Sequence, residues 1–375
     1  MKLKLRGSES DEIEWNLKPF EVGHAFWIPK VKKFNIEKLN KKSLTIKVPH
    51  RLAPIVMDLT RFCPTGTKQI NYGPGEVAIA IAPKLTIQMK FLNSEDIIIK
   101  GTKRDSIVKH IVLLFRKIIE KNFGVEISIK GELQLEHLGL GTSAVLFSGL
   151  SIGLNKLLGD MLTLQDLIKF VASNYCEEVR DSKDLIAPGF TTLGAFWSCI
   201  NGGVSIVSGD FELAFNEKFP EKVNVLLGFP KLNKEEIIEI TSEHSKKGFE
   251  MNVMDFVRHH DRFDASKTCY WVLMDLIPSI KRGDLKKAGE VIWSTNWNTI
   301  KSIPPILKHG SFEAFPLMTD LYSKGAEIVF LSSAGPSIAA ISTKLKIEEL
   351  TPIFKKYGYE TLEVDIDNKG AEFSD

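Results

Sequence analysis

Residues 137–150 have the sequence HLGLGTSAVLFSGL, and this stretch decides the fold. It follows a predicted strand at 125–131 and begins an apolar helix predicted over 142–159. Gly139 and Gly141 lack a β-carbon, so the backbone there can approach a ligand closely. The N–H groups of the first helical turn and the positive end of the helix dipole favour an anion. The pattern therefore predicts a phosphate-binding turn at the start of a buried helix.

Two hydroxyl residues follow the glycines. Thr142 and Ser143 could reach phosphate oxygens or a metal ion. The alternative is that Gly-Leu-Gly is only a tight turn and Thr142 only caps the helix. The local sequence favours the two interpretations equally, because glycine-rich turns before helices are common.

Composition narrows the class of protein. A chain of 375 residues suits two domains better than one. Its 49 basic and 47 acidic side chains give a net charge of +2, so we expect no nucleic-acid partner. We also expect no membrane span, because no apolar run reaches about 18 residues. The N-terminus lacks the apolar stretch of a secretory signal, and the four cysteines are scattered, which favours a reduced, cytoplasmic setting.

The hydrophobic pattern divides the chain into three parts. We assign residues 1–42 to an N-terminal extension, 43–215 to a phosphate-binding domain and 216–375 to a second domain. Periodicity predicts strands and helices in both domains. The stretch 76–91 alternates like a strand but contains Pro83, so it is either two strands or one bent strand.

Three motifs carry a resemblance to a known superfamily. GLGTSA (139–144) resembles the second signature of the GHMP kinases, LSSAGPSIAAIS (331–342) the third, and HRLAPIVMDL (50–59) the first. Their order and spacing fit that superfamily. The resemblance implies an α+β fold with an N-terminal ribosomal-protein-like βαβ domain and a C-terminal ferredoxin-like α/β sandwich.

Other stretches resemble one branch, the β-ribofuranosylaminobenzene 5'-phosphate synthases. They are Arg51-Leu52 with Asp58, NYGPGEVAIAIAPK (71–84) and PGFTTLGAFWSCINGGVSIVSG (188–209). The chain departs from that family's pattern at Ala53, Pro188 and Ala334. These departures leave open a divergent relative that binds ligand without catalysis.

The kinase branch usually places a catalytic aspartate just before the Gly-Gly strand. Here residues 188–203 contain no acidic residue. A general base must lie within hydrogen-bond reach of the proton it takes. We therefore rank the synthase above an ATP-dependent small-molecule kinase, which remains the alternative.

The synthase resemblance implies that phosphoribosyl pyrophosphate condenses with 4-aminobenzoate or 4-hydroxybenzoate, releasing pyrophosphate and CO2, in the synthesis of a methanopterin-type cofactor. It further implies a Mg²⁺ cofactor and small-molecule partners, and it allows a homodimer. Arg51 and Asp58 are the candidate catalytic residues, and Ser143 and Glu177 are the candidate metal ligands, with Glu178 as the alternative to Glu177. The candidate phosphate cradle consists of Gly139, Leu140, Gly141, Thr142, Ser143, Ala144, Ser333 and Gly335.

One further cluster, His259-His260-Asp261, at first resembles a metal site. Adjacent residues on a helix point about 100° apart and do not converge on one ion. The surrounding sequence is highly charged. We interpret this cluster as a solvated helix face.

Overall fold

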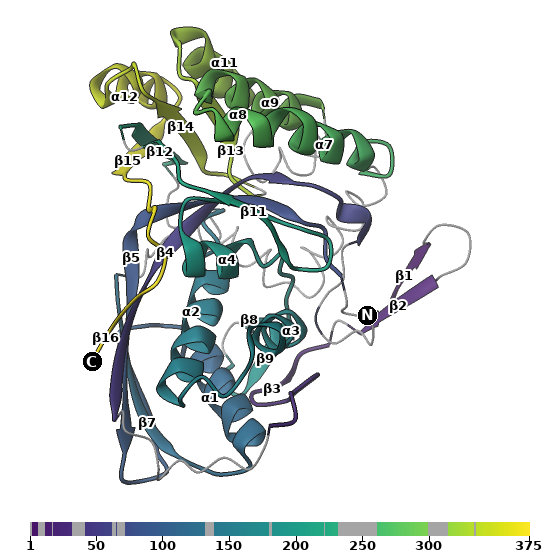
Figure 1. Cartoon of the computed structure of the whole chain (residues 1–375), viewed down its shortest axis with the longest axis vertical. Helices are drawn as coiled ribbons and strands as arrows, with labels where there is room; N and C mark the ends of the chain where they lie inside the picture. Colours follow the sequence, from purple (N-terminus) through teal and green to yellow (C-terminus); the bar gives the residue numbers. More distant parts are fainter. Residues whose placement is uncertain are drawn as a thin grey trace.

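The computed structural model describes residues 2–6, 12–16, 18–31, 42–61, 65, 72–131, 139–179, 182–220, 222–231, 261–298, 314–333 and 335–375. A large sheet carries helices on one face, and a smaller sheet with its own helices lies at one end of it (Figure 1). This arrangement confirms the predicted α+β class.

The large sheet is built around two long strands. β4 and β5 run antiparallel, and β5 is flanked on its other edge by β10 near its start and by β7 near its end. Its seven strands are β4 (Ser43–Val56), β5 (Glu76–Leu92), β6 (Ile97–Lys100), β7 (Gly124–Lys130), β10 (Val204–Val207), β11 (Leu213–Glu217) and β16 (Glu372–Ser374).

The stretch around Pro83 is one bent strand. β5 continues through Pro83, and its register with β4 shifts between Pro49 and His50, so that Ala82 and Pro83 have no partner residue on β4. A register shift of this kind bends a strand without ending it. The second of the two predicted alternatives is therefore correct.

Four helices cover one face of the large sheet (Figure 1). α2 and α4 pack on β4 and β5, and α1 and α3 pack on α2. Their bounds are α1 (Asp105–Ile119), α2 (Thr142–Leu157), α3 (Leu164–Asn174) and α4 (Gly194–Asn201). α3 ends at Asn174, before Glu177 and Glu178.

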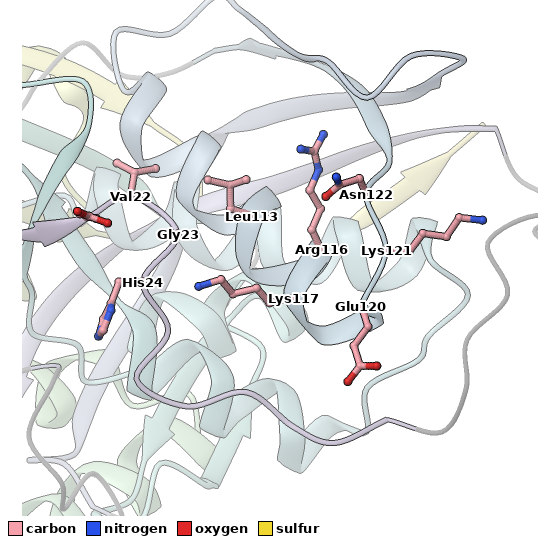
Figure 2. Close-up of a pocket in the computed structure, with 10 residues that line it drawn as sticks. Val22, Gly23, His24, Leu113, Arg116, Lys117, Glu120, Lys121 and Asn122 are labelled. Atoms are coloured by element: carbon pink, nitrogen blue, oxygen red, sulfur yellow. The ribbon is translucent and has the colours of Figure 1, made fainter.

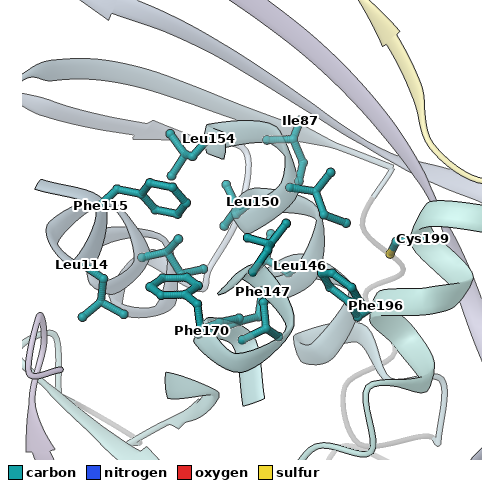
Figure 3. Packing of buried hydrophobic residues seen from close by; sticks show 14 of the residues in the cluster. Ile87, Leu114, Phe115, Leu146, Phe147, Leu150, Leu154, Phe170, Phe196 and Cys199 are labelled. Carbon is teal, nitrogen blue, oxygen red and sulfur yellow. The ribbon is translucent and has the colours of Figure 1, made fainter. Parts of the chain in front are cut away.

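α2 is apolar on nearly all sides because it is enclosed between the sheet and the other helices. Figure 3 shows Phe147 and Leu150 of α2 among Phe115 of α1, Phe170 of α3 and Ile87 of β5. A helix that is hydrophobic all round is typically buried in this way. This packing fixes the position of the first turn of α2.

The second unit has a four-stranded antiparallel sheet in the order β13-β14-β12-β15. Its strands are β12 (Asn224–Pro230), β13 (Ile328–Leu331), β14 (Ile338–Ser342) and β15 (Tyr359–Val364). Its helical segments are α7 (Ala265–Trp271), the π-helix η3 (Val272–Leu276), α8 (Ile277–Lys281), α9 (Leu285–Asn298), α11 (Ala314–Lys324) and α12 (Ile347–Lys356).

The ends of the chain join other elements. β1 (Lys2–Arg6) and β2 (Glu12–Asn16) form a hairpin, and β3 (Phe20–Glu21) joins β9 (Leu185–Pro188) and β8 (Cys176–Glu178) in a small sheet. At the other end of the chain, β16 pairs with β4 in the large sheet. The predicted domain boundary at 216 falls within β11, and the domain limits stay a prediction.

Among the helices that the structure describes, none is both long enough and apolar enough to cross a membrane.

Candidate active site

Two left-handed glycines shape the start of α2. Gly139 has φ +77° and Gly141, the N-cap residue, has φ +62°. A β-carbon at residue 139 would collide with the Ser332 carbonyl oxygen, and one at residue 141 would lie 3.0 Å from the Arg51 guanidinium. Gly141 is the N-cap and Thr142 is the first residue of the helix, so Thr142 is not the N-cap. The amides of the first turn are available to an anion.

Ser332 brings the three signature segments together. Its hydroxyl donates to the Gly139 carbonyl at 2.8 Å and accepts from the Ala53 amide at 3.1 Å. The Ser333 amide donates to the Ala53 carbonyl at 2.9 Å. Segments that are far apart in the sequence therefore meet at the mouth of α2.

Arg51 and Glu76 form a buried ion pair on the floor of the site. Arg51 Nη1 lies 3.4 Å from Glu76 Oε1, and both side chains are almost fully buried. The geometry of this contact is not that of a hydrogen bond. Within the described part of the chain, Arg51 Nε and Nη1 and Glu76 Oε1 therefore have no hydrogen-bond partner. Such buried, unsatisfied groups are costly without a ligand or water.

The second carboxylate oxygen of Glu76 is engaged from another direction. The Thr192 hydroxyl donates to Oε2, and the Gly194 amide donates to Thr192 Oγ1 at 3.3 Å. The absence of an acidic residue at 188–203 thus does not leave this region without a carboxylate. β5 supplies the carboxylate of Glu76 to this region.

A second buried arginine lies beside the helix start. Arg104 precedes α1, and its guanidinium donates to Ser143 Oγ at 2.7 Å and to Thr142 Oγ1 at 2.8 Å. Its charge adds to the positive end of α2. His50, next to Arg51, adds none at neutral pH, because burial lowers its pKa to about 4.

The two predicted acidic candidates point in different directions. Both lie on β8 and not at the end of a helix, because α3 ends before them. Glu177 lines the cavity at the α2 mouth and accepts a hydrogen bond from the Tyr175 hydroxyl. Glu178 accepts from Ser106 of α1 at 3.2 Å. Among the described residues, no group of three or more histidine, cysteine or acidic side chains is arranged to hold a metal ion.

These residues enclose a cavity of about 160 Å³. The predicted site residues that line it are Arg51, Gly139, Leu140, Gly141, Thr142, Ser143, Ala144, Glu177, Ser333 and Gly335. Sequence reasoning missed Glu76, Tyr175 and Thr192, which also line it, and Arg104 behind its wall. No local motif marks these four residues, since contacts distant in the sequence bring them here.

Asp58 lies elsewhere. It accepts from the Thr60 amide at 3.0 Å, and its carboxylate lies 3.3 Å from Arg61 Nε, in the turn formed by η2 (Leu59–Arg61). It does not line the cavity at the α2 mouth.

Asp261, which we assigned to a solvated helix face, is buried, and its carboxylate accepts from the Leu59 amide at 2.5 Å. The predicted solvation is therefore wrong for this residue. His259 and His260 lie outside the described residues.

Another hollow, of about 450 Å³, lies between the N-terminal segment and the end of α1 (Figure 2). His24, Lys117 and Glu120 line it, together with Arg116. None of the predicted site residues lies there.

Known proteins resemble this chain in sequence and in fold. No family model matches the chain. A homoserine kinase of Caldanaerobacter subterraneus subsp. tengcongensis is 22% identical over 327 residues, which cover 80% of this chain and 91% of that protein.

Solved structures agree on the fold. A homoserine kinase from Cytophaga hutchinsonii superimposes with a TM-score of 0.60 at 14% identity, covering 89% of this chain and 98% of that one. A mevalonate diphosphate decarboxylase from Enterococcus faecalis, studied for its mevalonate diphosphate-mediated ATP binding, gives a TM-score of 0.52 at 17% identity, covering 89% and 99%.

The chain has the GHMP-kinase-type fold. The homoserine kinase match and this shared fold agree with the resemblance of the three motifs. The comparisons do not single out the synthase branch. The kinase alternative fits them about as well.

Proposed function

We propose that this GHMP-type chain is an ATP-dependent kinase that phosphorylates a hydroxyl group of a small molecule. The observation that carries the proposal is the Glu76 carboxylate. It lines the same cavity as the α2 turn, and it already accepts a hydrogen bond from a hydroxyl, that of Thr192. A carboxylate in this position can serve as the general base that residues 188–203 lack.

The proposed reaction follows from these groups. The substrate oxygen attacks the γ-phosphorus of ATP, its proton passes to Glu76, and the bond to the ADP oxygen breaks. The amides of residues 142–144 and the Arg51 guanidinium stabilise charge on the phosphate oxygens. Arg51 is suited to this role because its guanidinium lies buried beside Gly141, and its Nε and Nη1 have no hydrogen-bond partner among the described residues.

We further propose that a magnesium ion binds at one wall of the site. Mg²⁺ is usually held by one or two carboxylates together with substrate phosphates. Glu177 offers such a carboxylate in the cavity, so we propose Glu177 as its protein ligand. When bound, the ion neutralises phosphate charge.

The acceptor would lie near Thr191, Thr192 and Phe190, which line the cavity next to Glu76. A cavity of about 160 Å³ favours a small molecule.

Phosphoribosyl transfer is the second candidate. A cradle of amides with a buried arginine suits pyrophosphate as a leaving group as well as it suits ATP. The Arg51-Leu52 pattern of the synthase branch supports this reading. The non-catalytic relative would bind one of these ligands without turnover.

A substrate panel separates the three possibilities. The purified chain is incubated with Mg²⁺ and ATP across sugar, amino-acid and isoprenoid alcohols, and ADP is measured. In parallel, it receives phosphoribosyl pyrophosphate with 4-aminobenzoate, and pyrophosphate and CO2 are measured. We expect ADP that depends on one class of alcohol. Release of pyrophosphate and CO2 without ADP would favour the synthase, and calorimetric binding without either product would favour the non-catalytic relative.

A further inference from the structure

Arg104 joins the starts of two helices at the cavity wall. It precedes α1, it is buried, and it donates one hydrogen bond to each of the first two side chains of α2. Both of those side chains, Thr142 and Ser143, line the cavity. The guanidinium thus lies directly behind the surface that an anionic ligand would meet.

These two hydrogen bonds set the donor and acceptor roles of the Thr142 and Ser143 hydroxyl groups. A guanidinium has donors only and stays charged, so both hydroxyl oxygens act as acceptors toward it. Each hydroxyl proton is then directed away from Arg104 and can be donated to another acceptor. A metal ion bound to Ser143 Oγ would be repelled by the positive charge of Arg104, whose Nη1 lies 2.7 Å from that oxygen.

We propose that Arg104 is a positioning residue that holds Thr142 and Ser143 as hydrogen-bond donors to a polyphosphate and keeps Ser143 from ligating magnesium. The inference rests on the proposed function, because it takes a nucleoside triphosphate as the ligand. On this inference Ser143 is no longer a candidate metal ligand, and Glu177 keeps that role.

Calorimetric titration with ATP tests this, first in EDTA and then in Mg²⁺. Arg104→Met should weaken ATP binding about tenfold or more in both conditions, because it removes the hydrogen bonds of a charged group. Arg104→Lys should recover part of the loss, since it keeps the charge without the two-pronged geometry. Ser143→Ala should weaken binding only a few-fold, and the ratio of affinities with and without Mg²⁺ should stay that of the wild type.

Two results would overturn the inference. One is ATP binding by Arg104→Met at wild-type strength. The other is loss of the Mg²⁺ effect in Ser143→Ala, which would make Ser143 a metal ligand.

Arg116→Met provides the matched control. Arg116 lies on the same helix but donates to the Phe123 carbonyl, at 3.1 Å from Nε, away from the cavity. This variant should bind ATP normally. Should Arg104→Met fail to fold, the double variant Thr142→Val/Ser143→Ala removes both hydroxyls and should show a similar loss in EDTA; wild-type binding by it would count against the inference.

The inference and the proposed function fail in different ways. Wild-type ATP binding without transfer to any alcohol would contradict the kinase but leave the role of Arg104 intact. No binding of ATP to the folded wild type would contradict both.

Discussion

The Glu76 carboxylate occupies the space in which a β-carbon of residue 194 would lie. Its Oε2 atom would overlap that carbon, and the same oxygen accepts the Thr192 hydroxyl. Gly194 is the first residue of α4, so the start of this helix is shaped around a side chain from β5. The relationship explains how a carboxylate reaches a segment that contains none.

Gly194→Ala should therefore displace Glu76. We expect turnover to fall at least about tenfold and the free energy of unfolding to fall by about 1–3 kcal/mol, as in other overpacked sites. Kinetics and urea unfolding measure the two effects. The double variant Glu76→Ala/Gly194→Ala should lose less stability than the sum of the losses in the two single variants, because the clash is gone. Additive losses in the double variant would show that the two residues do not interact.

Glu76→Gln should lower kcat by about 10²- to 10⁴-fold, the usual contribution of a general base. Affinity for ATP should change little. Glu178→Gln is the matched control, because Glu178 bonds Ser106 outside the cavity. Equal losses in the two variants would contradict the assignment of Glu76.

Asp58→Asn tests the catalytic role that the sequence predicts for Asp58. Asp58 contacts Thr60 and Arg61 in a partly exposed turn outside the cavity, so we expect kcat to change less than about threefold and stability to fall by roughly 0.5–1 kcal/mol. Steady-state kinetics and urea titration provide the check. A loss as large as that of Glu76→Gln would make Asp58 catalytic after all.

Asp261 gives a pH-dependent prediction. Burial raises the pKa of its carboxyl from 3.8 to about 7. Between these values the unfolded chain releases a proton that the folded chain retains, so the free energy of unfolding falls as pH rises. Asp261→Asn removes this dependence while keeping an oxygen acceptor for the Leu59 amide. We expect its stability relative to wild type to grow from pH 4 to 7, reaching at most about 4 kcal/mol.

Thermal or urea unfolding at pH 4, 5, 6, 7 and 8 measures this difference. Asp264→Asn, at a partly exposed neighbouring position, serves as the control; its charge contributes to the raised pKa of Asp261, so this variant should weaken the pH dependence without removing it. A parallel curve for Asp261→Asn would contradict the prediction.

Local patterns were sufficient to predict the α2 turn. The two glycines, the hydroxyl residues and the long apolar run specify a turn and a buried helix through contacts within a few residues. The structure accordingly places Gly139–Ala144 along the cavity. The alternation along β5 likewise indicated a strand, and only its bend at Pro83 needed the pairing with β4.

The charged residues could not be predicted in this way. Glu76 reaches Thr192 and Arg104 reaches Ser143 across 116 and 39 residues of chain, and only tertiary packing sets those distances. For the same reason, the local sequence at 188–203 did not indicate Glu76 as a general base. Conversely, Asp58 follows Arg51 closely in sequence, yet β4 ends at Val56 and the chain turns away before reaching it.

We propose above all that the mouth of α2 and Arg51 bind a polyphosphate. The most direct measurement is a crystal structure of the chain soaked with Mg²⁺ and a non-hydrolysable ATP analogue. We expect phosphate oxygens within hydrogen-bond distance of the amides of residues 142–144 and of the Arg51 guanidinium. Phosphates bound elsewhere, with this cavity unchanged, would contradict the account.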